Sequence, residues 1–395
     1  MIDIKDKSKC CGCEACSQIC PKSCISMIPD EEGFLYPFVD VKECINCGLC
    51  KKTCPVNNPT TLSSPKIEVF AAKNPSLTIR QSSSSGGFFS CVAENIVNDE
   101  GCVCGAAFDD NYDVSHIIVD SLKDLSKLRG SKYVQSRIGT IYKEIKVLLE
   151  GGKLVLFSGT PCQVAGLYAY IKKTYENLLT IEVFCHGVPS PLVWKDYVTE
   201  LSNNAKENQI ITDICFRDKQ KGWKNYSFSV SYKSKISDYE EKYTKREKRT
   251  ENKYLRAFLN NLIVRPICFS CPFKNGVSGA DISLGDFWSI DRYCHSFNDD
   301  KGVSLVYINS ERGLKSVQKL KVDKVVLKRN IDYNTAFSKS TKEKYNHSLF
   351  WNEYQKQHIA CLESICSEIE KKETNFYIEL KGIVKKIILE IYNRL

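Results

Sequence analysis

Cysteines dominate the first part of this 395-residue sequence, and their spacing repeats. The stretch "KCCGCEACSQICP" at residues 9–21 contains five cysteines, and "ECINCGLCKKTCPV" at residues 43–56 contains four. Each stretch includes three cysteines separated by two residues, then a fourth after three more residues and directly before a proline. Thiolates at this spacing can hold several corners of one iron–sulfur cluster, because the loop wraps around the metal. The pattern therefore predicts iron–sulfur chemistry.

Two sets of four ligands follow from this spacing, which is that of a bacterial two-cluster ferredoxin, where the fourth cysteine of each stretch ligates the other cluster. The predicted ligands of the first [4Fe-4S] cluster are Cys10, Cys13, Cys16 and Cys54. The predicted ligands of the second are Cys20, Cys44, Cys47 and Cys50. Cys11 and Cys24 remain over, and we expect them to be buried apolar thiols. Zinc, the alternative metal, fits this order poorly, since zinc sites usually take four ligands from two C-x2-C pairs.

Four further cysteines lie in contexts that favour metal binding or redox chemistry. Cys162 follows a predicted strand at the start of a helix, where the positive end of the helix dipole favours a thiolate. Cys185 follows the next strand, and Cys268 and Cys271 form another C-x2-C pair before a proline. From the spacing alone, a third [4Fe-4S] cluster, a Cys162–Cys185 redox pair and a C-x2-C thiol switch compete on equal terms.

The elements that must position these cysteines change in character after residue 58. Residues 1–58 are predicted to form a small module held together by its clusters, and residues 56–66 a polar linker. Beyond it, strands and helices alternate, which predicts an α/β body with α+β elements and a mixed sheet. Residues 153–185 read as strand, helix and strand, a βαβ unit with a parallel pair. Residues 102–119 predict a hairpin and residues 211–232 an antiparallel segment.

The end of the chain is predicted to be helical. Apolar residues recur at helical spacing between residues 376 and 395, with lysines on the opposite side. We expect this helix to pack on the body or to join two copies of the chain. Peripheral binding to a membrane surface is the alternative.

Composition narrows the class of protein. The chain has 21 cysteines, no apolar run long enough to span a membrane, and a charged N-terminus unlike a secretory signal. We therefore expect reduced thiols in a cytoplasmic protein. The formal charge is +9, from 56 basic and 47 acidic residues, but the densest basic stretch is interleaved with glutamates. That stretch favours a solvated face over a nucleic-acid site.

Five motifs in order make the body resemble the family of coenzyme F420 hydrogenase/dehydrogenase beta subunits. They span about residues 67–300 and read "SSSSGGFFS", "GSKYVQS", "LVLFSGTPCQVAGL", "CHGVPSP" and "CFSCPFKNGVSGADISLGDFW". The resemblance implies a flavin-dependent oxidoreductase with a [4Fe-4S] cluster beside the flavin, and so favours the third cluster. It also implies a division into a flavin-binding part (67–150), a C-terminal part with the third cluster (151–345) and a helical tail (346–395).

The resemblance further implies which residues contact a bound FAD or FMN. They are Ser84, Ser85, Gly86 and Gly87 before a predicted helix, Ser131, Lys132, Tyr133 and Gln135, and Thr160 and Gln163 beside Cys162. Lys132 is expected near the flavin N1, where a cation stabilises the reduced, anionic ring. Without the resemblance, the serines would read as a helix cap and Lys132 as a surface lysine. Asp286 and Trp288 either line this pocket or anchor the loop after the C-x2-C pair, and Trp288 could instead pack in the core. His186 either relays protons or forms a hydrogen bond with the backbone.

The predicted function is electron transfer between ferredoxin-type one-electron carriers and a two-electron acceptor such as coenzyme F420 or another small organic substrate. The expected partners are a ferredoxin or other redox protein and a small hydride acceptor or donor, and not nucleic acid. One alternative is a non-catalytic electron-transfer subunit that docks onto a partner enzyme. Another is a ferredoxin module fused to a structural or regulatory domain.

Overall fold

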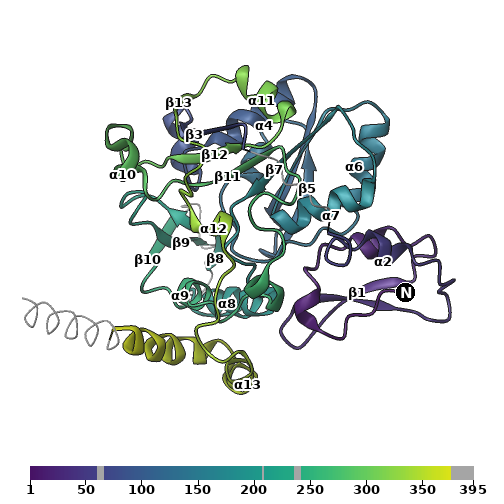
Figure 1. Ribbon diagram of the computed structural model, residues 1–395. Helices are drawn as coiled ribbons and strands as arrows, with labels where there is room; N and C mark the ends of the chain where they lie inside the picture. Colours follow the sequence, from purple (N-terminus) through teal and green to yellow (C-terminus); the bar gives the residue numbers. More distant parts are fainter. Residues whose placement is uncertain (60–65, 207–208, 235–241, 375–395) are drawn as a thin grey trace, which may run out of the picture.

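A computed structural model describes residues 1–59, 66–206, 209–234 and 242–374 of the chain (Figure 1). A small N-terminal module lies beside a larger body that is built around an eight-stranded sheet. Within the described ranges, no helix is both long enough and apolar enough to cross a membrane. The predicted amphipathic helix of residues 376–395 falls outside these ranges.

The N-terminal module contains little regular structure. Its elements are η1 (Lys7–Lys9), α1 (Ala15–Gln18), the antiparallel strands β1 (Ile25–Pro29) and β2 (Leu35–Val39), and α2 (Leu49–Thr53). Its own core consists of two isoleucines and three cysteines, namely Ile2, Ile25, Cys16, Cys24 and Cys50. So small an apolar core stabilises a fold only weakly, which agrees with a module that relies on bound metal.

The central sheet of the body mixes parallel and antiparallel pairs. Its strands lie in the order β13 (Asp323–Val326), β3 (Glu68–Lys73), β12 (Ser304–Ile308), β11 (Ile282–Asp286), β7 (Leu178–Val183), β6 (Val155–Gly159), β4 (Cys102–Phe108) and β5 (Val114–Val119). The four strands β11, β7, β6 and β4 run parallel, and the outer strands pair antiparallel. Nearly every residue of β6 and β7 is buried, which is typical of parallel strands covered on both faces.

The predicted α/β body and mixed sheet are confirmed. The βαβ unit is formed by β6, α7 (Pro161–Ile171) and β7, and Val155 pairs with Leu178 in its parallel register. The predicted hairpin is the antiparallel pair of β4 and β5. The resemblance implied a division of the body at residue 150. The parts on either side of it share this one sheet, because β4 pairs directly with β6.

Helices cover both faces of the sheet. On one face lie α6 (Ile141–Glu150) and α7, and on the other lie α4 (Phe88–Asn98), α5 (Leu125–Leu128) and α11 (Glu311–Gln318). The alternation of a strand is visible in β4, where Cys102 and Cys104 pack toward α6 and α7 while Val103 packs toward α4. The N-terminal module lies against the side that carries α7 (Figure 1).

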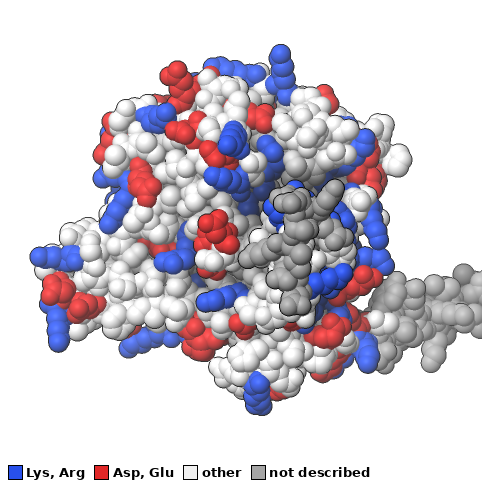
Figure 2. Space-filling view, turned by 180° about the vertical axis from the view of Figure 1, so that it is seen from behind, with Lys and Arg blue, Asp and Glu red and all other residues white. Residues whose placement is uncertain are grey.

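A second, three-stranded antiparallel sheet confirms the antiparallel segment predicted around residues 211–232. It consists of β8 (Gln209–Asp218), β9 (Ser227–Ser234) and β10 (Lys242–Lys248). Its aromatic core also includes residues of α8 (Pro191–Asn203), α9 (Lys253–Leu259) and α13 (His347–Gln357). The remaining short elements are α3 (Leu77–Ser82), η2 (Pro266–Ser270), α10 (Ile290–Cys294), η3 (His295–Phe297), α12 (Thr335–Ser338) and η4 (His358–Ala360). Basic and acidic side chains both occur across the face in Figure 2.

Candidate functional site

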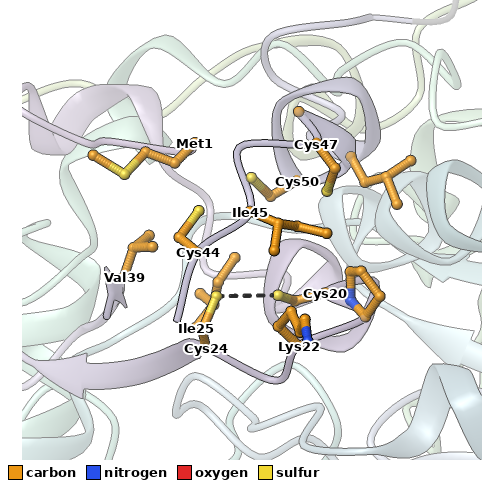
Figure 3. A pocket seen from close by; sticks show the side chains of 13 residues that line it. Met1, Cys20, Lys22, Cys24, Ile25, Val39, Cys44, Ile45, Cys47 and Cys50 are labelled. Atoms are coloured by element: carbon orange, nitrogen blue, oxygen red, sulfur yellow. Dashed lines mark hydrogen bonds between the residues drawn. The ribbon is translucent and has the colours of Figure 1, made fainter. Parts of the chain in front are cut away.

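The outermost cysteines gather at a pocket on the surface of the module (Figure 3). The pocket is lined by the four predicted ligands of the second cluster, which are Cys20, Cys44, Cys47 and Cys50. Cys24, which the spacing left over, lines the same pocket. Cys47 is exposed, and the Cys20 and Cys24 sulfurs are 3.4 Å apart. The amide of Ile2 donates to the Cys50 sulfur at 3.1 Å. Such N–H···S bonds temper the negative charge of thiolates that bind a cluster. We call the four predicted ligands the outer set.

The predicted first set, which we call the inner set, lies deeper. Burial, reinforced by the nearby Cys10 and Cys54 thiols, raises the pKa of Cys16 to about 12. Gly166 of α7 lies so close to Cys13 that an added Cβ would stand 2.8 Å from the Cβ of Cys13. A glycine at this position therefore lets the module pack directly on α7. The inner set comprises Cys10, Cys13, Cys16 and Cys54.

A second pocket, which we call the central pocket, collects cysteines from distant parts of the chain. It is lined by the four further cysteines for which the spacing alone left three interpretations open. We call them the central set: Cys162, Cys185, Cys268 and Cys271. Burial raises the pKa of Cys185 to about 12, and the thiols of Cys162 and Cys271 add to the shift against the effect of Lys274. Four neighbouring thiols of raised pKa form a donor set that a positive metal centre would suit.

Cys11 connects the inner set to the central set. It is buried, as predicted, but it lines the central pocket and its thiol interacts with that of Cys162. Its neighbour Cys10 belongs to the inner set, so one step along the backbone joins the two. In the described ranges, no group of three or more His, Cys, Asp or Glu side chains is arranged to hold a metal ion. The assignment of all twelve ligands therefore stays a prediction.

Cys162 is positioned by its helix. It stands in the first turn of α7, directly after the carboxyl end of β6. Thr160 and Gln163 form a capping box around it, and the Thr160 hydroxyl lies 3.2 Å from the Cys162 sulfur. The capped N-terminus places a thiol where the helix dipole favours negative charge.

A large cavity of about 460 Å³ adjoins the central pocket. It lies at the carboxyl ends of the parallel strands, and residues from the ends of β6, β7 and β11 line it. In open α/β sheets this edge is where ligands bind. The segment from Cys185 to Val188 lines both the cavity and the central pocket. A cofactor in the cavity would therefore lie next to the central set.

Eight of the ten predicted flavin contacts line this cavity. They are Ser84, Ser85, Gly87, Ser131, Lys132, Tyr133, Thr160 and Gln163. The two predicted motifs meet there, since the amide of Ser131 donates to the Ser84 hydroxyl at 2.7 Å. The hydroxyl of Ser85 donates to the Val303 carbonyl at 2.8 Å. These two serines thus brace the wall, rather than capping the following helix.

The other two predicted contacts are absent from the cavity lining. A Cβ on Gly86 would stand 2.4 Å from the Ala72 carbonyl oxygen. The close approach of the two backbone segments therefore explains why this residue is a glycine. The side-chain amide of Gln135 donates to the carbonyl of Cys11 at 3.1 Å and accepts from Arg265 at 2.9 Å. Gln135 thus faces the module, because the chain turns between Lys132 and Ser136.

Lys132 contributes its ammonium group to the cavity wall. The Nζ atom donates to the carbonyls of Lys127 and Arg129 at 2.8 and 3.0 Å. Burial of the ammonium lowers the pKa of Lys132 to about 7. Anchoring and burial of this group do not agree with a free surface lysine. Near pH 7 the amine is partly protonated, and its ammonium form would stabilise negative charge on a ligand in the cavity.

Arg217 and its partners form a part of the wall that the sequence motifs did not reveal. Its guanidinium pairs with Asp286 at 3.0 Å and donates to the Tyr133 hydroxyl at 3.1 Å. It also lies 4.7 Å from the ring centre of Trp288, which stacks on Trp223. Asp286 and Trp288 therefore line the pocket, the first of the two alternatives for "GDFW". The strand sequence around Arg217 gave no motif that could have identified it.

Two histidines border these pockets. His116 lines the cavity, donating from Nε2 to the Ser158 carbonyl at 3.0 Å and accepting at Nδ1 from the Ser136 hydroxyl at 2.7 Å. Burial lowers the pKa of His116 to about 4, so the ring is neutral near pH 7. His186 lines both pockets, and its Nε2 lies 2.6 Å from the Asn261 side-chain oxygen. His186 is thus a hydrogen-bonded imidazole, but its partner is a side chain and not the predicted backbone group.

Two family models match this chain, one in the N-terminal module and one in the body. Residues 9–58 match the 4Fe-4S dicluster domain, and residues 152–333 match the C-terminal family of the coenzyme F420 hydrogenase/dehydrogenase beta subunits. The chain thus joins a segment that matches the 4Fe-4S dicluster domain to a segment that is similar to this beta-subunit family. Both predictions of family are thereby confirmed. The matched segment of the body begins after residue 150, so the stretch 67–150 lies outside it.

Individual relatives agree with this assignment. An uncharacterized ferredoxin of Methanocaldococcus jannaschii is 43% identical over 54 residues, 14% of this chain and 69% of that protein. An uncharacterized protein of the same organism is 26% identical over 46% of this chain and 61% of its own length. One of the subunits of the F(420)H(2) dehydrogenase of Methanosarcina mazei is 22% identical over 48% of this chain and 58% of its own length. The chain thus spans about three fifths of the two longer relatives.

Among solved structures, a chain of the F420-reducing [NiFe] hydrogenase complex from Methanosarcina barkeri is similar to this one. It is 16% identical, and the match covers 67% of this chain and 84% of that chain with a TM-score of 0.42.

Proposed function

We propose that this chain is an iron–sulfur flavoprotein oxidoreductase that exchanges single electrons at its surface and electron pairs in its cavity. The observation that carries the proposal is the order of the sites. The outer set opens to the surface, the inner set packs on α7, the central set lies beyond Cys11, and the cavity adjoins the central set. This order agrees with a function that links one-electron carriers to a two-electron reaction.

Each site contains residues of the types that bind the groups this function needs. The outer and inner sets would hold the two [4Fe-4S] clusters of the dicluster domain, and the central set would hold a third. The cavity would hold an FAD or FMN, with Ser84, Ser131 and Lys132 on its wall. Clusters carry single electrons, whereas a flavin stores two and can pass a hydride.

The hydride partner that the relatives suggest is coenzyme F420, which is named in the M. mazei dehydrogenase, or another small organic molecule. The one-electron partner would be a ferredoxin or a comparable redox protein that approaches the exposed Cys47. The matched proteins are described as subunits, which favours a second candidate function. In that case the chain would pass electrons to a partner enzyme without carrying out hydride transfer itself.

Stopped-flow reduction of the bound flavin by reduced ferredoxin tests the proposal. A ferredoxin is too large to enter the cavity, so in this proposal its electrons pass through the cysteine sets. We expect Cys162→Ala to keep the flavin but to abolish its rapid reduction, because the central set loses a ligand. Cys91→Ala, in α4 and outside all three sets, is the matched control and should behave like the wild type.

Two results would contradict this proposal. Rapid flavin reduction in Cys162→Ala would remove the central set from the path. A wild-type protein that binds clusters but no flavin would favour the electron-transfer subunit instead.

A further inference from the structure

Arg265 is a fully buried cation at the junction of the module and the body. Its side chain has no exposed surface, and it belongs to the body, directly before η2, the short helix that carries Cys268. It also lines the central pocket. The inner and central sets therefore share this guanidinium.

Neutral groups accept all the hydrogen bonds of Arg265. Its Nε donates to the Cys10 carbonyl at 2.7 Å and its Nη2 to the Leu35 carbonyl at 2.8 Å. Its Nη1 donates to the side-chain oxygen of Gln135 at 2.9 Å, and its Nη2 lies 3.6 Å from the Cys10 sulfur. The guanidinium also lies 4.3 Å from the ring centre of Tyr36. These contacts fix the position of the charge.

No acidic side chain of the described residues forms an ion pair with Arg265. The nearby carboxylate of Glu14 accepts instead from the amides of Ile138 and Gly139, at 2.8 and 3.2 Å. A buried charge without an opposite charge is costly, so negative charge must come from another group. The cysteine sets are thus its natural counter-charge.

The outer set has a different environment. The cation that lines its pocket is Lys22, which is exposed, so water screens its charge. A fixed cation in a dry environment acts much more strongly on a nearby redox centre than an exposed one does. The two halves of the dicluster domain therefore experience unequal fields.

We propose that Arg265 is a positioning residue that raises the reduction potential of the inner cluster above that of the outer cluster. Extra negative charge is gained when a cluster accepts one electron, and the adjacent guanidinium stabilises this charge. The inner cluster is then the better acceptor of the two, and single electrons move from the surface toward the body. The inference rests on the proposed function only in that the inner cysteines bind a cluster.

The test is an anaerobic redox titration of the full-length protein, monitored by the electron paramagnetic resonance signals of the reduced clusters. In Arg265→Gln we expect the ratio of reduced to oxidised inner cluster, at a fixed ambient potential, to fall about tenfold, which corresponds to ~59 mV for one electron. The outer cluster is the internal control and should keep its potential. Arg265→Lys should restore most of the shift, since it keeps the charge.

A second variant separates charge from structure. Gln135→Glu keeps Arg265 and places a carboxylate on the atom that accepts its hydrogen bond, so the field at the inner cluster should weaken in the same direction. Arg137→Gln removes an exposed cation near Glu14 and should leave both potentials unchanged. If Arg265→Gln does not fold, Gln135→Glu alone decides.

The proposal is overturned if inner and outer clusters are present but keep their wild-type potentials in Gln135→Glu and in any folded Arg265→Gln. A wild-type protein whose inner cysteines bind no iron would overturn this inference and the proposed function together. If the protein lacks flavin but Arg265→Gln still lowers the reduction potential of the inner cluster, the inference is supported and the proposed function is contradicted.

Discussion

The N-terminal module and the body bring their cysteines together in opposite ways. In the module, eight predicted ligands lie between residues 10 and 54, on loops and in the two short helices α1 and α2. In the body, the central set comes from residues 162, 185 and 268–271, and a buried sheet and its helices hold it. Cysteine spacing therefore predicts the first kind of site, whereas the second kind is assembled only by the fold.

The two regions also differ in what stabilises them. The core of the module consists largely of cysteines, while both faces of the body's sheet are covered by buried aliphatic and aromatic residues. Hydrophobic burial can stabilise the body without metal, but the module has little apolar surface to bury. We therefore expect the module to need bound metal in order to fold, whereas the body should fold without it.

The largest expected effect is on folding when iron is removed. After anaerobic chelation, residues 1–58 should lose nearly all protection from amide hydrogen exchange, while β6, β7 and α7 keep theirs. Hydrogen exchange measured by mass spectrometry reports both regions in one sample. Equal loss of protection in both would contradict the contrast between them.

A smaller effect should follow from breaking the ion pair in the wall of the cavity. Asp286→Ala leaves the buried guanidinium of Arg217 without its partner, and we expect the free energy of unfolding of the body to fall by about 3 kcal/mol. Urea denaturation followed by circular dichroism measures this change. Asp291→Ala, which removes the exposed partner of Lys224, is the control and should cost much less. A loss of iron from the module in Asp286→Ala would show that the regions are not independent.

Lys132 tests the cavity as a cofactor site. Lys132→Met should weaken flavin binding about tenfold, since the anchored cation on the wall is lost, and the iron content should stay unchanged. Fluorescence titration with FAD and with FMN gives the dissociation constants. Lys127→Met, whose side chain is largely exposed, is the matched control. Equal affinities in all three proteins would remove Lys132 from the site.

The smallest effect concerns pH and is confined to the body. The pKa of His116 is lowered to about 4 by burial, so the unfolded chain takes up a proton near its ordinary pKa of about 6.5 while the folded chain does not. Stability contributed by the neutral ring is thus present above about pH 6.5 and is lost as the pH falls toward 4. Between pH 7 and 5.5 we expect a loss of about 1 kcal/mol.

Replacement of the histidine identifies the source of this slope. His116→Gln can still accept from Ser136 and donate to Ser158, and it should remove the loss seen in urea denaturation between those two pH values. His295→Gln, at an exposed side chain, should keep it. A slope that survives in His116→Gln would assign the effect to another group.

Sequence reasoning succeeded where the signal is local. The C-x2-C-x2-C-x3-C-P spacing and the strand–helix–strand pattern around Cys162 each depend on neighbouring residues, and both family predictions are confirmed. It failed where contacts are distant. Gln135 and Cys11 lie at the junction of module and body, and the pairing of Arg217 with Asp286 joins two separate strands. No local pattern encodes such contacts.

If the proposed function is correct, the module and the body together hold three clusters and a flavin. The most direct measurement is the iron and flavin content of protein purified without oxygen. About 12 irons and one flavin per chain would agree with three cubanes and an occupied cavity. About 8 irons without flavin would mean that only the module binds clusters, and would contradict the account.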